Sequence, residues 1–132
     1  MKRDLAVALA VAALAAGAQA SAHHSFAATY LEGQSVTIEG QLVQFLLRNP
    51  HSFVHVMVKQ SDGSTVRYVV EWGSVPQLGR QGISRDTLKP GDYVIISGSP
   101  GRNLDDNRMR LISFRRPKDG LSWGLLPNEK FD

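Results

Sequence analysis

Residues 65–77, TVRYVVEWGSVPQ, join a strand directly to the start of a helix, and this junction decides the fold. Thr65 to Trp72 has the β-branched and aromatic composition of a half-buried strand. Ser74 is suited to cap a helix, Gln77 completes a capping box three residues later, and the first turn tolerates the proline between them. Gly82 is a natural stop, so we expect a helix of about two turns.

Two strands are expected before this junction. Residues 36–47 alternate apolar and polar side chains, with Gly40 at an expected bend or bulge. The Arg-Asn-Pro-His stretch at 48–51 interrupts the pattern because proline lacks a ladder donor. Residues 52–60 alternate again, and Asp62-Gly63 is a hairpin signal. We therefore predict three consecutive antiparallel strands, over residues 36–47, 52–60 and 65–72.

Two registers compete for the hairpin that joins residues 52–60 to residues 65–72. In the first, Val54 faces Glu71, which brings a charge into the apolar face. In the second, with a bulge at Gly63, the three alternating valines of residues 54–58 face Trp72, Val70 and Tyr68, and charged side chains separate from apolar ones. We prefer the second register, which places His55 directly opposite Glu71 on the outer face.

Two more strands follow the helix. A Lys-Pro-Gly-Asp turn at 89–92 leads into a strand over 93–98, and a polar loop separates it from a strand over 108–114. Three strands, a short helix and two strands is the order of the OB-fold, a five-stranded Greek-key barrel with its helix between strands 3 and 4. We therefore predict an all-β domain of this type, with a small open β-sandwich as the competing architecture.

The amino terminus has the parts of a secretory signal peptide. Lys2 and Arg3 precede a short apolar run, and small residues in A-x-A arrangement place cleavage after Ala20 or Ala22. The run is too short to span a membrane, and no later segment qualifies. We expect a periplasmic or secreted bacterial protein, divided into residues 1–22 as signal peptide, 23–34 as N-terminal arm, 35–116 as OB-like barrel and 117–132 as C-terminal tail.

Composition excludes several kinds of site. The chain has no cysteine, which rules out thiol catalysis, thiolate metal sites and iron–sulfur clusters. Its formal net charge of +3 is too mild to indicate a nucleic-acid partner. Basic residues nevertheless gather late in the chain, and the late basic strip comprises Arg102, Arg108, Arg110, Arg115, Arg116 and Lys118. The expected partners are a metal ion or an envelope component, with the oligomeric state left open.

A set of short motifs resembles a family of small exported bacterial proteins. The motifs, in order, are His-His-Ser-Phe at 23–26, Asn-Pro-His at 49–51, Glu-Trp-Gly at 71–73, Leu-Gly-Arg-Gln-Gly at 78–82 and Leu-Lys-Pro-Gly-Asp at 88–92. That family is classed as a domain of unknown function. The resemblance implies an OB-like envelope protein, and it supplies no catalytic residues.

Histidines near the expected new amino terminus are the candidate metal ligands. Cleavage after Ala22 would place His23 first, so that its α-amine and ring form two arms of a histidine-brace site. Cleavage after Ala20 would give a Ser-Ala-His start, whose four nitrogens suit square-planar Cu(II) or Ni(II). Both products favour copper over zinc. We predict copper binding by His23 and His24, with His51 as a candidate third ligand.

Other interpretations stay open. The His-His segment also fits a soluble spacer, and a metal-free module would bind a glycan, peptide or protein through the barrel face or the late basic strip. His51 and His55 share a strand face but lie roughly 13 Å apart at strand rise, too far for one metal. A hydrolase would need a pocket that joins His51, His55 and Glu71. No catalytic motif is visible, so we expect a protein that is not an enzyme.

Overall fold

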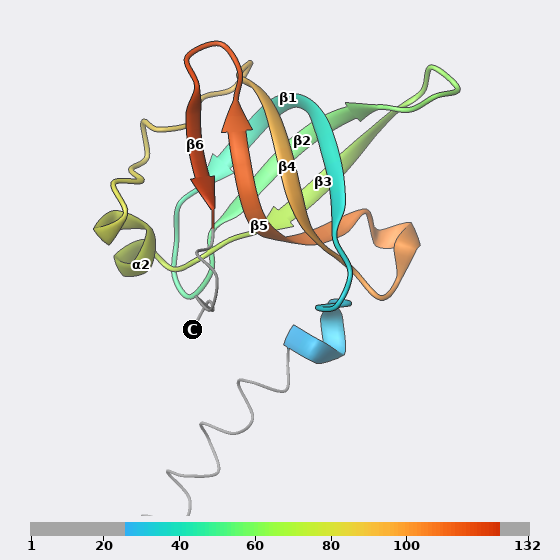
Figure 1. Cartoon of the computed structure of the whole chain (residues 1–132), viewed down its shortest axis with the longest axis horizontal. Helices are drawn as coiled ribbons and strands as arrows, with labels where there is room; N and C mark the ends of the chain where they lie inside the picture. The colour runs from blue at the N-terminus through green and yellow to red at the C-terminus, as the bar shows by residue number, and fades with distance from the viewer. Residues whose placement is uncertain (1–25, 125–132) are drawn as a thin grey trace, which may run out of the picture.

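The computed structural model describes residues 26–124 and shows a small β-barrel (Figure 1). Its strands are β1 (Val36–Leu46), β2 (Phe53–Lys59), β3 (Thr65–Glu71), β4 (Tyr93–Pro100), β5 (Arg108–Arg116) and β6 (Leu121–Gly124). Helix α2 (Val75–Arg80) lies between β3 and β4, and a single 3₁₀ turn (Leu104–Asp106) lies between β4 and β5. Between residues 26 and 124 no helix is long and apolar enough to cross a membrane.

The strand connectivity confirms the predicted OB-fold. The sheet order is β3-β2-β1-β4-β5-β6, and an additional parallel pairing of β3 with β5 closes the first five strands into a barrel. Gly40 lies where β1 passes from β4 to β2, and a Cβ there would come 2.0 Å from the Met57 carbonyl oxygen. Ser74 caps helix α2 as predicted, because its side chain accepts a hydrogen bond from the Gln77 amide at 3.3 Å. The Gln77 side chain does not complete the predicted capping box, since its Oε1 is buried without a hydrogen-bond partner among the described residues.

The predicted hairpin register is wrong by one two-residue step. Phe53 pairs with Glu71 and His55 pairs with Val69, so His55 is not opposite Glu71. The reason is the turn: the Gly63 amide donates to the Gln60 carbonyl at 3.0 Å and Gly63 has a φ of +86°, which closes the hairpin tightly. An even-numbered shift keeps each side chain on its face, so the predicted separation of apolar from polar residues holds.

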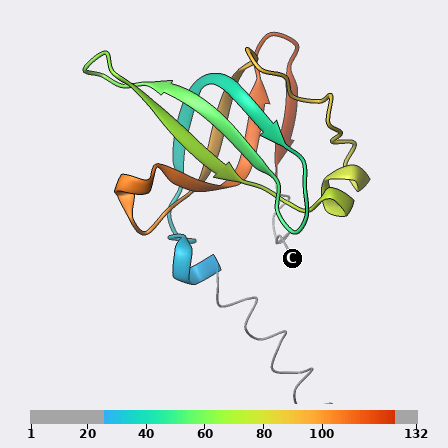
Figure 2. The same ribbon diagram turned by 180° about the vertical axis from the view of Figure 1, so that it is seen from behind.

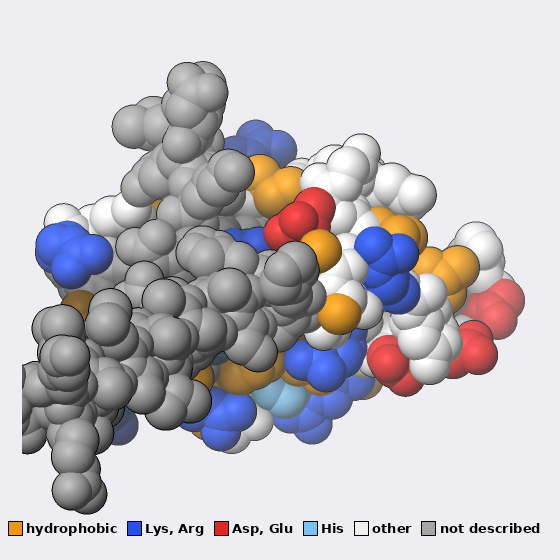
Figure 3. Space-filling model, turned by 90° about the horizontal axis from the view of Figure 1, so that it is seen from below, with side chains coloured by type: hydrophobic (Ala, Val, Ile, Leu, Met, Phe, Trp, Pro, Cys, Tyr) orange, Lys and Arg blue, Asp and Glu red, His pale blue; other side chains and the backbone are white. Residues whose placement is uncertain are grey.

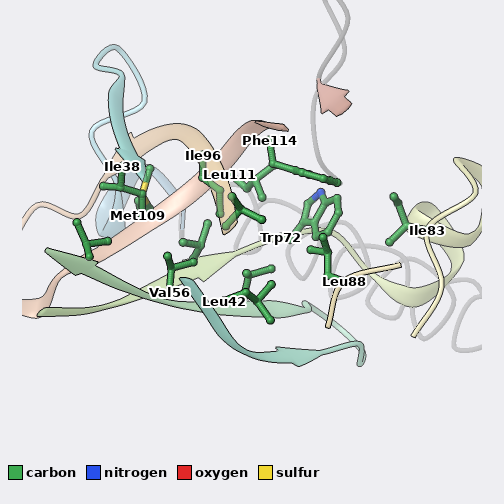
Figure 4. Close-up of a cluster of buried hydrophobic side chains, with 14 of the residues drawn as sticks. Ile38, Leu42, Val56, Trp72, Ile83, Leu88, Ile96, Met109, Leu111 and Phe114 are labelled. Carbon is green, nitrogen blue, oxygen red and sulfur yellow. The ribbon is translucent and has the colours of Figure 1, made fainter. Parts of the chain in front are cut away.

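The barrel interior is a continuous apolar core (Figure 4). Val56, Leu42, Ile96, Met109 and Leu111 point toward one another, and all are at most 1% exposed. At one end Trp72 packs edge-on against Phe114, with ring centroids 5.3 Å apart. Burying each such side chain contributes about 1.5–3 kcal/mol, which is how a domain without disulfides holds together.

Strand β6 extends the sheet beyond the predicted five strands. It pairs with the end of β5, and Trp123 packs edge-on against Trp72 with a centroid distance of 5.0 Å. Part of the predicted C-terminal tail therefore packs on the barrel, and residues 125–132 lie outside the described range. Asp92 is buried nearby, where burial opposes its ionisation but hydrogen bonds from Lys118 and Arg116 lower its pKa to about 2.

The segment before β1 lies against one end of the barrel, next to the β4–β5 connection (Figure 2). Residues 26–29 form a helical turn, and Tyr30 follows as an isolated bridge to Gly101. Two backbone hydrogen bonds attach the segment to the barrel. The Leu31 amide donates to the Pro100 carbonyl and the Arg102 amide donates to the Thr29 carbonyl, both at 2.9 Å. Tyr30 is 1% exposed, so this segment is part of the folded domain.

Candidate functional site

A buried carboxylate, Glu71, is the centre of a polar cluster at one end of the barrel. It sits on the outer face at the end of β3, where the barrel closes onto β5 and the segment before β1 covers it. Its side chain is only 9% exposed. Tyr30, His51 and Arg108 all direct polar atoms at it. We call these four residues the Glu71 cluster.

Each oxygen of Glu71 has its own partners. The Tyr30 hydroxyl donates to Oε2, and an Arg108 Nη2 lies 3.5 Å from the same oxygen. The His51 Nδ1 lies 2.6 Å from Oε1. Buried carboxylates are costly unless they are paired and hydrogen-bonded, so the three partners explain how this charge is held inside the protein. Burial and the hydrogen bond to Glu71 both raise the pKa of Tyr30, which keeps its hydroxyl protonated as a donor.

His51 is held in one orientation by contacts on two sides. Its Nδ1 is fixed by Glu71, and its ring lies against the Phe26 ring with centroids 5.0 Å apart. Between residues 26 and 124 no group hydrogen-bonds to its Nε2, and the side chain is 27% exposed. A histidine whose Nδ1–H is held by a carboxylate presents a basic Nε2, which is the arrangement found around metal-binding histidines.

The helical turn at residues 26–29 is clamped beside His51. The Arg110 guanidinium lies over the Phe26 ring, 4.0 Å from its centroid, and pairs with Glu32 at 3.1 Å. The Arg102 Nε donates to the Ala27 carbonyl at 2.6 Å. Cation–π and charge-assisted contacts of this kind fix the position of an exposed turn. The start of the described chain is therefore anchored directly against the His51 ring.

The described residues include one of the three predicted metal ligands. His51 lies in the Glu71 cluster, whereas His23 and His24 lie outside the described residues. His55 is not part of the Glu71 cluster. Its Nδ1 accepts a hydrogen bond from the Arg67 Nε at 3.0 Å. The predicted surface pair of His55 with Glu71 is wrong, since the register shift moves them apart along the hairpin. Within residues 26–124 no group of three or more His, Asp or Glu side chains could hold a metal.

Several side chains of the late basic strip form salt bridges within the protein. Arg108 pairs with Glu71, Arg110 with Glu32, and Arg116 with Asp92 at 2.7 Å. Figure 3 views the molecule from below and shows lysine or arginine side chains beside a histidine on that face. Arg108 and Arg110, two members of the late basic strip, both contact the segment before β1.

Comparisons with known proteins place the chain in a family. The model of a family of unknown function, DUF6152, matches residues 10–110. The chain belongs to the DUF6152 family. This assignment confirms the resemblance to a domain of unknown function. No curated protein matches the chain. A mitochondrial single-stranded DNA-binding protein of S. cerevisiae is similar in structure, with a TM-score of 0.48 and 14% identity over 63% of this chain and 92% of that one.

Proposed function

We propose that this DUF6152 protein binds Cu(II) through the histidines of its processed amino terminus, His23 and His24, together with Nε2 of His51. The proposal includes export to the periplasm and removal of the leader, which frees an amino group beside an imidazole. The single observation that carries it is the position of His51, held at Nδ1 by Glu71 and packed against Phe26.

Covalent geometry supports bringing these residues together. His24 and His23 precede Phe26 by two and three residues. An extended chain spans at most about 3.6 Å per residue, so the His23 Cα lies within roughly 11 Å of the Phe26 Cα. Histidine side chains shorten the remaining gap to the His51 ring, which touches Phe26. His23, His24 and His51 can therefore come close enough to bind one metal ion.

The chemistry of the donors favours copper. The described residues offer one preoriented imidazole nitrogen, and the sequence adds two imidazoles and a primary amine, all nitrogen donors of intermediate softness. Nitrogen sets of this kind suit Cu(II) ahead of Mg²⁺ or Ca²⁺, which prefer oxygen. Two carboxylates, Glu71 and Glu32, pair with Arg108 and Arg110 and offset the charges of these two arginines near His51.

Glu71 and Tyr30 act in this proposal as positioning residues. Glu71 holds the proton on Nδ1 of His51, which leaves the lone pair on Nε2, and Tyr30 fixes Glu71 from the segment before β1. Mutation of a residue that hydrogen-bonds a metal ligand commonly changes the metal affinity of a protein by about 10–100-fold. In this proposal, the burial of the Glu71 carboxylate and its bonds to Tyr30 and His51 serve to orient the metal ligand.

The experiment uses the exported, processed protein. Intact mass spectrometry gives its first residue, and competition titration with a copper chelator gives its Cu(II) affinity. We expect His23→Ala and His51→Ala each to weaken Cu(II) binding at least tenfold, while His55→Ala, the matched control on β2, binds as the wild type does. Unchanged affinity in both His23→Ala and His51→Ala would contradict the proposal.

A further inference from the structure

The outer face of β1 and the β2–β3 hairpin carries a second group of polar side chains, distinct from the Glu71 cluster. It consists of Gln44 on β1, Arg48 in the following loop, Phe53 and His55 on β2, and Arg67 on β3. We call these residues the outer-face cluster. Register places them together, because Gln44 pairs with His55 and Phe53 lies two residues before His55 on the same face.

Hydrogen bonds and stacking preorganise this cluster. The Arg67 Nε donates to the His55 Nδ1 at 3.0 Å, and its Nη2 donates to the Gln44 Oε1 at 3.3 Å. The Arg48 guanidinium lies over the Phe53 ring, 4.9 Å from its centroid. Because the His55 Nδ1 accepts a hydrogen bond, the proton of the neutral ring is on Nε2, which is a donor. Two guanidinium groups and one imidazole N–H are thus held on one face.

The charge of the outer-face cluster is unbalanced. In the described part of the chain neither Arg48 nor Arg67 pairs with a carboxylate, whereas Arg108, Arg110 and Arg116 all do. Burial, Arg67 and Arg48 together lower the pKa of His55, so both guanidinium groups act on the same ring. Planar guanidinium donors in fixed positions match the oxygen atoms of an oxyanion.

We propose that the outer-face cluster binds a phosphate-type oxyanion, with Arg48, Arg67 and Nε2–H of His55 as its donors. This site goes beyond the proposed copper function and shares no residue with it. The phosphate group would come from free phosphate in solution or from a phospholipid headgroup, because both present the same tetrahedral oxygens. A bound anion would offset the positive charges of the two arginines. It would therefore reduce their repulsion of a protonated His55.

The test follows the ring protons of His55 by NMR during a titration with inorganic phosphate, at constant ionic strength. We expect a saturable change in the His55 signals and a rise in its pKa at saturation. The Arg48→Gln/Arg67→Gln double variant should bind phosphate at least tenfold more weakly. Arg80→Gln, which removes an exposed arginine from helix α2, is the matched control and should bind as the wild type does.

A second arm distinguishes the sources. Co-sedimentation with vesicles of phosphatidylglycerol in phosphatidylcholine, compared with phosphatidylcholine alone, reports headgroup binding. A saturable phosphate titration would show that the site binds the free anion. Vesicle binding that the double variant loses would show that the site binds the lipid headgroup. Failure of both arms, or equal binding by the double variant and the wild type, overturns the proposal. Neither arm involves His23 or His51, so the result is independent of the copper titration.

Discussion

Tyr30→Phe removes one hydroxyl from the Glu71 cluster and leaves the rest of the side chain in place. Tyr30 is 1% exposed, and its hydroxyl donates to the buried Glu71 carboxylate. Hydrogen bonds to charged groups contribute about 1.5–3 kcal/mol, so the variant should lose about that much stability. For a domain of roughly 100 residues, 1 kcal/mol corresponds to about 4–8 °C. We therefore expect the melting temperature to fall by roughly 6–24 °C.

The matched control is Tyr93→Phe. Tyr93 is 46% exposed and its hydroxyl interacts with Glu39 at the surface, so its loss should change stability by no more than about 0.5 kcal/mol. Thermal and urea unfolding followed by circular dichroism measures both variants. Equal stabilities for Tyr30→Phe and Tyr93→Phe would refute the reasoning, because it would show that the buried carboxylate does not depend on its tyrosine donor.

Three further predictions concern the barrel. Gly40→Ala would place a Cβ 2.0 Å from a backbone carbonyl of the facing strand and should cost about 3 kcal/mol in urea unfolding, whereas Gly33→Ala, with no atom within 4 Å of its Cβ, should be neutral. The lowered pKa of Asp92 means that its contribution to stability is complete above pH 3.8 and is lost as the pH falls to about 2, so Asp92→Asn should lose less stability than the wild type over that interval. Arg67→Gln should raise the pKa of His55 in an NMR titration, and an unchanged or lower value would count against the outer-face cluster.

The order of strands could be predicted from sequence because local signals agree with the final structure. Alternation marks the strands, and Ser74 and Gln77 mark the start of helix α2. The face of each side chain on the β2–β3 hairpin was also predictable, since it depends only on the two-residue period. The exact register was not, because it depends on how the turn before Gly63 closes, and a shift of two residues leaves the pattern of faces unchanged.

The Glu71 cluster could be predicted only in part. His51 was a candidate third metal ligand, but Tyr30 and Arg108 are 41 and 37 residues away from Glu71 in sequence and meet it only when the barrel closes. A charged residue next to the apolar run of β3 was the available signal, and it was interpreted as a surface pair. Strand β6 was missed because four residues of a Gly- and Pro-rich tail carry too little periodicity.

The role of His51 as a copper ligand is tested most directly by pulsed EPR of the Cu(II)-loaded, processed protein, which counts imidazole rings bound to the metal. We predict that His51→Ala loses one imidazole relative to the wild type, while His55→Ala retains the full number. An identical imidazole count in His51→Ala and the wild type would contradict the account.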